Sequence, residues 1–234
     1  MPHRFFVESP IASNRATLAG SEAHHVQHVM RMHVGDELLL FDGGGSEFRG
    51  RIESMGRQQV EVTVLQRHEH NVELAAELTV GAALPKADRQ RWLVEKLTEL
   101  GTTRFVPLRT RRSVVHPDDK SLNKLRRAVI EASKQCGRNR LLHVTPLTSL
   151  DAFLATAPDD AQKWFGHAQG SAANTDRSDQ PLYVAVGPEG GLADEEIGAA
   201  RQQGWRAVSL GPRILRIETA CLALATLAAQ RFFR

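Results

Sequence analysis

Two arginines and a glutamate lie close together just before the last apolar run of the chain. In "SLGPRILRIETAC" (209–221), Arg213, Arg216 and Glu218 follow a Gly-Pro pair and precede a segment with almost no polar side chains. An unpaired charge beside a buried element is costly, so these side chains need partners. We therefore expect this turn to contact a ligand, another chain or both.

A glycine-rich loop at residues 187–191 is the second candidate site. The sequence "LYVAVGPEGGLADEE" predicts a strand, this loop and the start of a helix, the arrangement in which α/β proteins bind cofactors beyond the carboxyl ends of strands. The loop contains neither GxGxxG nor GKS or GKT, and Glu189 and the acids at 194–196 would repel a pyrophosphate. A neutral or cationic ligand fits better. The alternative is a tight turn whose acids only complement the helix dipole.

Histidines and cysteines do not form a recognisable metal or hydrolase motif. Four histidines lie between residues 24 and 33, and His24 and His28 could share a helix face, but the glutamate of HExxH is missing. We therefore expect no metal and favour a surface or RNA-facing helix. Cys136 and Cys221 have neither the spacing of a zinc site nor the density of a disulfide scaffold, so we expect two buried thiols.

Basic residues are concentrated in two stretches, although the net charge of the 234-residue chain is only +3. These stretches are "RTRRS" (109–113) and "KLRRAVIEASKQCGRNR" (124–140). Local positive fields suit a phosphate backbone, and the alternative is a pair of solvated helix faces. No apolar run approaches the roughly 20 residues of a membrane span, and the first residues contain no apolar targeting segment, so we expect a cytoplasmic protein.

The elements that position these residues fall into two groups along the chain. Residues 36–66 alternate apolar and polar side chains as strands do, with "DGGG" (42–45) predicted as a hairpin connection. A short helix is predicted before them, leading into a turn at Gly35 and Asp36. These patterns predict a small β-barrel-like domain that ends near residue 72.

From Leu74 onward, predicted strands alternate with predicted helices. One helix ends at Gly101, the next carries an apolar stripe over residues 121–136, and a polar loop is predicted at 167–181. Such alternation implies an α/β domain with a mostly parallel sheet covered by helices. The last helix, "ETACLALATLAAQRFF", is apolar on nearly every side, which favours burial, most readily at a subunit interface.

Four motifs together resemble one known family. They are "LVEKLTELG", "EASKQCGRNR", "GPEGG" after a strand, and "LGPRILRIETA" before the last helix. Over essentially its whole length the sequence resembles the bacterial 16S rRNA (uracil-N3)-methyltransferases of the SPOUT superfamily. The resemblance implies a PUA-like barrel at residues 1–72 that helps to hold RNA. It also implies an α/β methyltransferase domain at 73–234 with a trefoil knot, a rare exception to unknotted topology.

The resemblance further implies a cofactor, partners and a reaction. The cofactor is S-adenosylmethionine, bound in the knot, and the protein is a homodimer. The substrate is N3 of a uridine in the decoding region of 16S rRNA in the small ribosomal subunit. A cationic sulfonium without phosphate agrees with the acidic glycine loop, and the apolar last helix agrees with dimerisation.

Three loops of this sequence map onto the cofactor site of the family. The residues assigned to it are His167, Val186, Gly187, Glu189, Gly190, Gly191, Leu210, Gly211, Ile214, Leu215, Arg216, Thr219 and Ala220. Backbone groups of the third loop, with apolar contacts from Leu210, Ile214 and Leu215, would hold the adenine. The basic residues expected to contact RNA are Arg4, Arg31, Lys86, Arg109, Arg111, Arg112, Lys134, Arg138 and Arg140.

The same mapping gives the charged residues of the turn their expected roles. Arg216, or Arg213, would stabilise negative charge on the uracil carbonyl oxygens, because N3 must lose its proton. Glu218 would orient the arginine and cap the helix rather than act as the base, since a helix N-terminus stabilises its ionised form. Two alternatives stay open: a non-catalytic RNA-binding ribosome assembly factor on the same fold, and a nucleotide-dependent α/β enzyme, which the missing phosphate-binding motifs disfavour.

Overall fold

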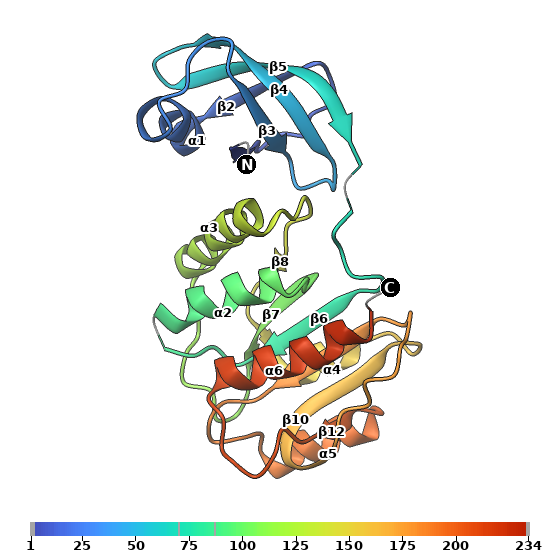
Figure 1. Ribbon diagram of the computed structural model, residues 1–234. Coiled ribbons are helices and arrows are strands. Elements are labelled where there is room, and N and C mark those ends of the chain that lie inside the picture. Colours follow the sequence, from blue (N-terminus) through green and yellow to red (C-terminus); the bar gives the residue numbers. More distant parts are fainter. Residues whose placement is uncertain (1–2, 70, 87, 233–234) are drawn as a thin grey trace. The chain divides into compact units, whose positions relative to one another are not determined.

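Two units, each with its own β-sheet, make up the chain in the computed structural model, which describes residues 3–69, 71–86 and 88–232 (Figure 1). The first unit runs up to Glu73 and also takes in Ser133–Leu141. The second unit holds Leu74–Ala132 and the chain after Leu141. The segment Ser133–Leu141, which the sequence assigns to the second domain, therefore groups with the first.

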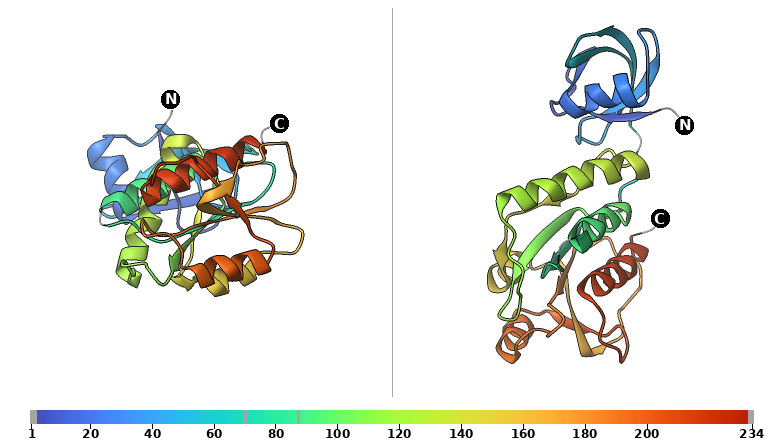
Figure 2. Two further views of the ribbon diagram at one scale, coloured as in Figure 1. Left: turned by 90° about the horizontal axis from the view of Figure 1, so that it is seen from below. Right: turned by 90° about the vertical axis from the view of Figure 1, so that its left-hand side faces the viewer.

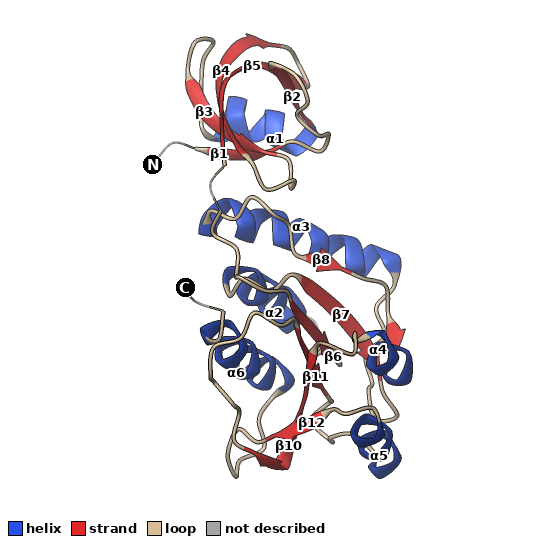
Figure 3. Ribbon diagram, turned by 90° about the vertical axis from the view of Figure 1, so that its right-hand side faces the viewer, coloured by secondary structure: helices blue, strands red, loops and turns tan. Residues whose placement is uncertain are grey.

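The first unit is a curled sheet of five strands around an apolar core (Figure 3). Its elements are β1 (Arg4–Phe6), β2 (Arg15–Ala19), α1 (Gly20–His24), the π-helix η1 (His25–Val29), β3 (Glu37–Phe41), β4 (Glu47–Met55) and β5 (Gln59–His68). The strand order is β1-β3-β4-β5-β2, with β1 parallel to β3 and the other pairs antiparallel. Alternate side chains such as Val60 and Val62 fill the core, which confirms the predicted strand pattern.

Two short features of this unit follow from local sequence. The predicted hairpin connection joins β3 to β4, and Gly43 and Gly45 adopt φ values of 85° and 104° there, a region that glycine enters without strain. The predicted short helix is present as α1 and η1, and two residues after η1 ends, Arg31 is a non-glycine residue with φ of 52°.

The second unit is a parallel sheet with helices on both faces. Its elements are β6 (Leu78–Ala82), α2 (Asp88–Glu99), β7 (Arg104–Arg109), α3 (Asp119–Cys136, which continues into the first unit), β8 (His143–Val144), β9 (Thr148–Ser149), α4 (Leu150–Thr156), β10 (Gln162–Ser171), β11 (Leu182–Val186), α5 (Asp194–Gln202), β12 (Arg206–Val208) and α6 (Ile217–Gln230). The strand order is β12-β10-β11-β6-β7-β8, with β9 beside β7, and every pair is parallel. The alternation of predicted elements is confirmed.

Helices α2 and α6 lie side by side on one face of this sheet, and α4 and α5 cover the other (Figures 2 and 3). Because both faces are covered, the central strand β6 is buried along its whole length. Helix α2 packs through Leu93 and Leu97 and ends before Gly101, whose φ is 83°, as predicted. No helix within the described residues is long and apolar enough to cross a membrane.

The structure corrects one expectation about the end of the chain and leaves another untested. The predicted loop at 167–181 is shorter, because β10 continues to Ser171, where it pairs with Val208 of β12 after a register shift. Gly170 permits this close approach, since a Cβ there would lie 2.7 Å from the backbone of Ala207. Helix α6 is buried within the single chain on one side only, and Leu222 and Leu227 on its other side are half-buried.

Candidate functional site

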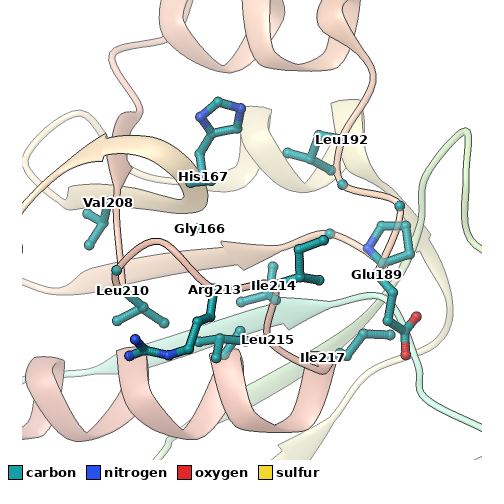
Figure 4. A pocket seen from close by; sticks show the side chains of 18 residues that line it. Gly166, His167, Glu189, Leu192, Val208, Leu210, Arg213, Ile214, Leu215 and Ile217 are labelled. Carbon is teal, nitrogen blue, oxygen red and sulfur yellow. The ribbon is translucent and has the colours of Figure 1, made fainter.

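A pocket of about 310 Å³ lies beside the middle of β10 and beyond the carboxyl ends of β11 and β12 (Figure 4). Three segments line it: Gly166–Ala168, Val186–Leu192, and the stretch from Val208 to Ala220 that leads into α6. In Figure 4 the side chains of Leu210, Leu215 and Ile217 lie towards α6, and His167 and Leu192 lie on the opposite side. This edge of a parallel sheet is where α/β proteins place their ligand sites.

Glycines let the backbone form the wall of this pocket. A Cβ on Gly187 would lie 2.9 Å from the side chain of Leu192, so a larger residue would displace the loop. Gly191 and Gly211 have φ values of 70° and 100°, which other residues adopt only with strain. The result is a wall of main-chain amides and carbonyls that a ligand can approach closely.

The structure brings together almost all the residues assigned from sequence to the cofactor site. Eleven of them line the pocket: His167, Val186, Gly187, Glu189, Gly190, Gly191, Leu210, Gly211, Ile214, Leu215 and Ala220. Arg216 and Thr219 are exposed and do not line it. The sequence-based assignment did not include six other lining residues, which are small or apolar and belong to or border the same three loops: Gly166, Ala168, Pro188, Leu192, Val208 and Ile217. Their position next to the assigned loop residues is the sequence feature that could have identified them.

The two arginines of the turn occupy different positions. Arg213 lines the pocket, whereas Arg216 is the N-cap residue of α6, with φ of −67° and ψ of 155°, and its side chain makes no capping hydrogen bond. Ile214 between them is 90% exposed although it borders the pocket. The turn thus leaves two cationic side chains and one apolar side chain exposed on the described chain.

Glu218 has a different partner from the one expected. Its side chain is only 7% exposed, and its Oε1 accepts a hydrogen bond of 3.0 Å from Nη1 of Arg89 in α2. Within the described residues its Oε2 is buried without a hydrogen-bond partner. Within the described residues of the single chain, the ion-pair partner of Glu218 is therefore Arg89, and the role of Glu218 in orienting Arg213 or Arg216 stays a prediction. The first turn of α6 turns this side chain towards α2, while both arginines precede the helix.

The basic stretch at 109–113 contacts the glycine loop. Nη1 of Arg112 donates a hydrogen bond of 2.7 Å to the carbonyl oxygen of Gly190. The backbone N–H of Arg111 donates to Oε1 of Glu196 at 2.9 Å, and Nη1 of Arg111 lies 3.3 Å from Oε2 of Glu195. The two arginines were expected to contact RNA, and the structure places both against the acidic segment.

The second basic stretch contains side chains that hold the first unit together. Arg138 is buried, and its Nε donates a hydrogen bond of 3.1 Å to Oε1 of Glu73. Nζ of Lys134 lies 2.9 Å from Oε1 of Glu22, and both side chains are largely buried.

Arg4 is part of the same arrangement. It pairs with Glu47 and also donates to Oδ1 of Asn139 at 2.8 Å. By contrast, Arg31, Lys86, Arg109 and Arg140 are exposed. Of the nine basic residues assigned to RNA from sequence, Arg4, Lys134 and Arg138 are thus engaged inside the first unit.

The remaining candidate residues are two neighbouring histidines, His24 and His28, and the two cysteines of the chain. The rings of His24 and His28 lie 4.8 Å apart, centroid to centroid, on one helix face. Within the described part of the chain, no group of three or more histidine, cysteine, aspartate or glutamate side chains could hold a metal ion. Cys221 is buried, and this burial raises the pKa of its thiol, whereas Cys136 is only half-buried, unlike the expectation.

Family models match both parts of this chain. Residues 72–229 match the model of an RNA methyltransferase domain, and residues 18–65 match that of an RNA methyltransferase PUA domain. The ribosomal RNA small subunit methyltransferase E of Bacillus subtilis is 33% identical over 92% of this chain and 90% of its own length. The protein of the same name from Synechocystis is 32% identical over 91% of this chain and 72% of its own length.

Solved structures agree with these matches. The ribosomal RNA small subunit methyltransferase E of Neisseria gonorrhoeae, bound to S-adenosyl methionine, superimposes with a TM-score of 0.87 at 29% identity, covering 96% of this chain and 95% of that one. A Legionella pneumophila structure, described as a methyltransferase in complex with the bound cofactor SAM, has a TM-score of 0.87 at 30% identity and covers 98% of both chains. The chain therefore belongs to the RNA methyltransferase family that includes the ribosomal RNA small subunit methyltransferases E.

Proposed function

We propose that this protein transfers a methyl group from S-adenosylmethionine to N3 of a uridine in 16S rRNA, in the decoding region of the small ribosomal subunit. The observation that carries the proposal is the pocket of three loops, in a chain whose relatives are ribosomal RNA small subunit methyltransferases. Two of the similar solved structures hold the same cofactor.

The residues of the pocket fit S-adenosylmethionine. Leu210, Ile214 and Leu215 offer apolar surface for an adenine, and the glycine backbone offers amides and carbonyls at close range. The one charged side chain of the glycine loop is Glu189, which suits a cation and disfavours a phosphate. These features argue against the nucleotide-dependent alternative.

The arginines of the third loop are proposed to act on the uracil. The bound cofactor supplies an electrophilic methyl group on its sulfonium, and in-line placement of N3 gives most of the acceleration. Negative charge appears on the uracil carbonyl oxygens when N3 loses its proton. Arg213, which lines the pocket, and Arg216, at the start of α6, are proposed to stabilise this charge by donating hydrogen bonds to it.

Glu218 is proposed to support the site rather than to accept the proton. Its carboxylate lies in the first turn of α6, and its Oε1 already accepts a hydrogen bond from Arg89. The pair also ties the start of α2 to the start of α6, next to the loop that carries Arg213 and Arg216.

The wider assembly is also proposed. We assign the first unit, which contains residues up to Glu73 and Ser133–Leu141, to a PUA-like RNA-binding domain, and the second unit to a SPOUT methyltransferase domain with a trefoil knot at its C-terminal end. A homodimer is supported by the half-buried Leu222 and Leu227 of α6 and by the exposed Ile214 at the pocket. The exposed Arg31, Lys86, Arg109 and Arg140 are proposed RNA contacts, and a cytoplasmic location follows from an rRNA substrate.

Methyl transfer to isolated ribosomal material tests the proposal directly. Small-subunit RNA and assembled small subunits, both from cells that lack the protein, are incubated with the purified chain and S-adenosylmethionine carrying a labelled methyl group. Nucleoside mapping should find the label at N3 of one uridine. Tight cofactor binding without transfer to either substrate would contradict the proposed reaction. No measurable cofactor binding would favour the non-catalytic assembly factor.

A further inference from the structure

A tight turn at residues 110–113, which follows β7, holds the glycine loop of the cofactor pocket. Within the turn, the backbone N–H of Ser113 donates to the carbonyl of Thr110 at 3.3 Å, and the Ser113 hydroxyl lies 3.0 Å from the Thr110 N–H. Arg111 and Arg112 project from it. We propose that Arg112 is a positioning residue that fixes the glycine loop in the shape its ligand requires.

The contact of Arg112 fixes the orientation of one peptide group. Nη1 of Arg112 donates to the carbonyl oxygen of Gly190 at 2.7 Å, and the N–H of Gly191, in the same peptide, donates to the carbonyl of Pro188 at 2.8 Å. The C=O and N–H of a trans peptide point in opposite directions, so this plane is held from both sides. Because Gly191 has φ of 70°, the chain bends sharply at this point.

The stem of Arg112 also lies beside the loop. A Cβ built on Gly190 would lie 3.6 Å from Cδ of Arg112, which is ordinary van der Waals contact. The guanidinium Nη1 is also 3.5 Å from the carbonyl of Leu192, two residues further on. One arginine side chain thus spans the outer side of the loop.

Glu196 attaches the same turn to the helix that follows the loop. This residue is only 7% exposed, and its two carboxylate oxygens accept from the backbone N–H groups of Arg111, at 2.9 Å, and Ala193, at 2.8 Å. The Arg111–Glu195 ion pair nearby is exposed and adds little. The turn therefore holds both ends of the segment from Gly190 to Glu196.

The need for such a contact follows from the composition of the loop. Gly187, Gly190 and Gly191 can sample many conformations, and a glycine loses more conformational freedom on ordering than any other residue. A loop that is already ordered binds its ligand more tightly, because less entropy is lost on binding. This inference rests on the proposed function, in which the loop forms part of the S-adenosylmethionine site.

Two readouts on the full-length protein test the inference. The first is amide hydrogen exchange of residues 187–192 without cofactor, and the second is the dissociation constant for S-adenosylmethionine from calorimetry. Arg112→Ala should speed exchange in this segment and weaken cofactor binding about tenfold, as expected for the loss of one charge-assisted hydrogen bond. Arg109→Ala is the matched control, because Arg109 is an exposed cation at the end of β7 and should change neither readout.

A conservative substitution and a second site separate the possible outcomes. Arg112→Lys should recover part of the affinity, since an ammonium group can donate to one carbonyl but cannot span two. Glu196→Gln, which replaces a carboxylate oxygen with an N–H₂ group facing a backbone donor, should also speed exchange at 187–192. If amide exchange at 187–192 and S-adenosylmethionine affinity of Arg112→Ala equal those of the wild type, the inference is wrong. If only RNA binding is weaker in this variant, Arg112 is an RNA contact instead. If the wild-type protein does not bind S-adenosylmethionine, the proposed function fails, and the exchange data still decide the role of Arg112.

Discussion

The arginines of the third pocket loop and Arg138 of the segment Ser133–Leu141 look alike in sequence and differ in the structure. Arg213 and Arg216 lie at an open pocket and a helix start. Arg138 is buried against Glu73. A guanidinium that is exposed at a site can act on a ligand, whereas one that is buried in an ion pair maintains the fold. Local charge density does not distinguish these two cases, because the distinction depends on where the acidic partner lies.

The largest effect that separates the two groups is expected at Arg138. Its side chain is 4% exposed, so Arg138→Ala would leave the carboxylate of Glu73, itself largely buried, without its cation. Breaking a buried pair in this way costs about 3 kcal/mol. Urea unfolding should show this loss of stability, while S-adenosylmethionine affinity should stay at the wild-type value. Arg140→Ala, two residues away and exposed, is the control and should unfold like the wild type.

At the start of α6, next to the pocket, the opposite pattern is expected for Arg216. Arg216→Ala should lower turnover roughly 100-fold, the scale for removing one preorganised donor, with little change in cofactor affinity or stability. Lys should rescue poorly, because a point charge cannot reproduce the planar set of donors. Tenfold weaker cofactor binding with normal turnover at saturation would instead make Arg216 a cofactor ligand. Activity lost only on dilution would make it a dimer contact.

Glu218 combines features of both groups, since it lies near the pocket and is buried in an ion pair. Glu218→Gln keeps an acceptor for Arg89 but removes the charge. We expect about 1 kcal/mol lower stability, because Arg89 is 37% exposed and solvent weakens the pair. Turnover should fall far less than in Arg216→Ala. A loss in turnover as large as that of Arg216→Ala, with normal stability, would instead identify Glu218 as the proton acceptor.

The smallest effects are expected at the exposed cations. Arg109→Ala and Arg140→Ala should each weaken binding to small-subunit RNA a few-fold, and each should lower the slope of log K against log salt by about 0.7 to 0.9. Lys134→Ala should leave this slope unchanged, because its ammonium is paired with Glu22 and largely buried. Equal slopes for all three variants would show that burial does not separate the RNA contacts from the structural cations.

Most of the fold follows from short-range patterns in the sequence. Val60 and Val62 alternate as strand residues do, Gly101 ends a helix, and the glycine loop at 187–191 marks the end of a strand. Two of the three pocket loops were predictable from their own motifs, "GPEGG" and "LGPRILRIETA", whereas the loop with His167 was assigned only through the family resemblance. Each of these signals lies within a few residues of the feature that it predicts.

The interactions that were not predicted join residues far apart in the chain. Arg89 and Glu218 are separated by 129 positions, Arg112 and Gly190 by 78, and Arg138 and Glu73 by 65. Likewise, β10 reaches Ser171 only because β12 is present to pair with it. A single sequence contains both partners of each contact but does not show that they pair. Charged residues that pair within the folded chain were therefore assigned to RNA contacts.

The grouping of Ser133–Leu141 with the first unit means that the N-terminal barrel is not a contiguous module. A fragment that stops at Glu73 would lose Asn139, the partner of Arg4, and Arg138, the partner of Glu73 itself. Recombination that moved the first third of the gene to another protein would therefore transfer an incomplete barrel. A transferred barrel can be complete only if the distant segment Ser133–Leu141 is transferred together with it.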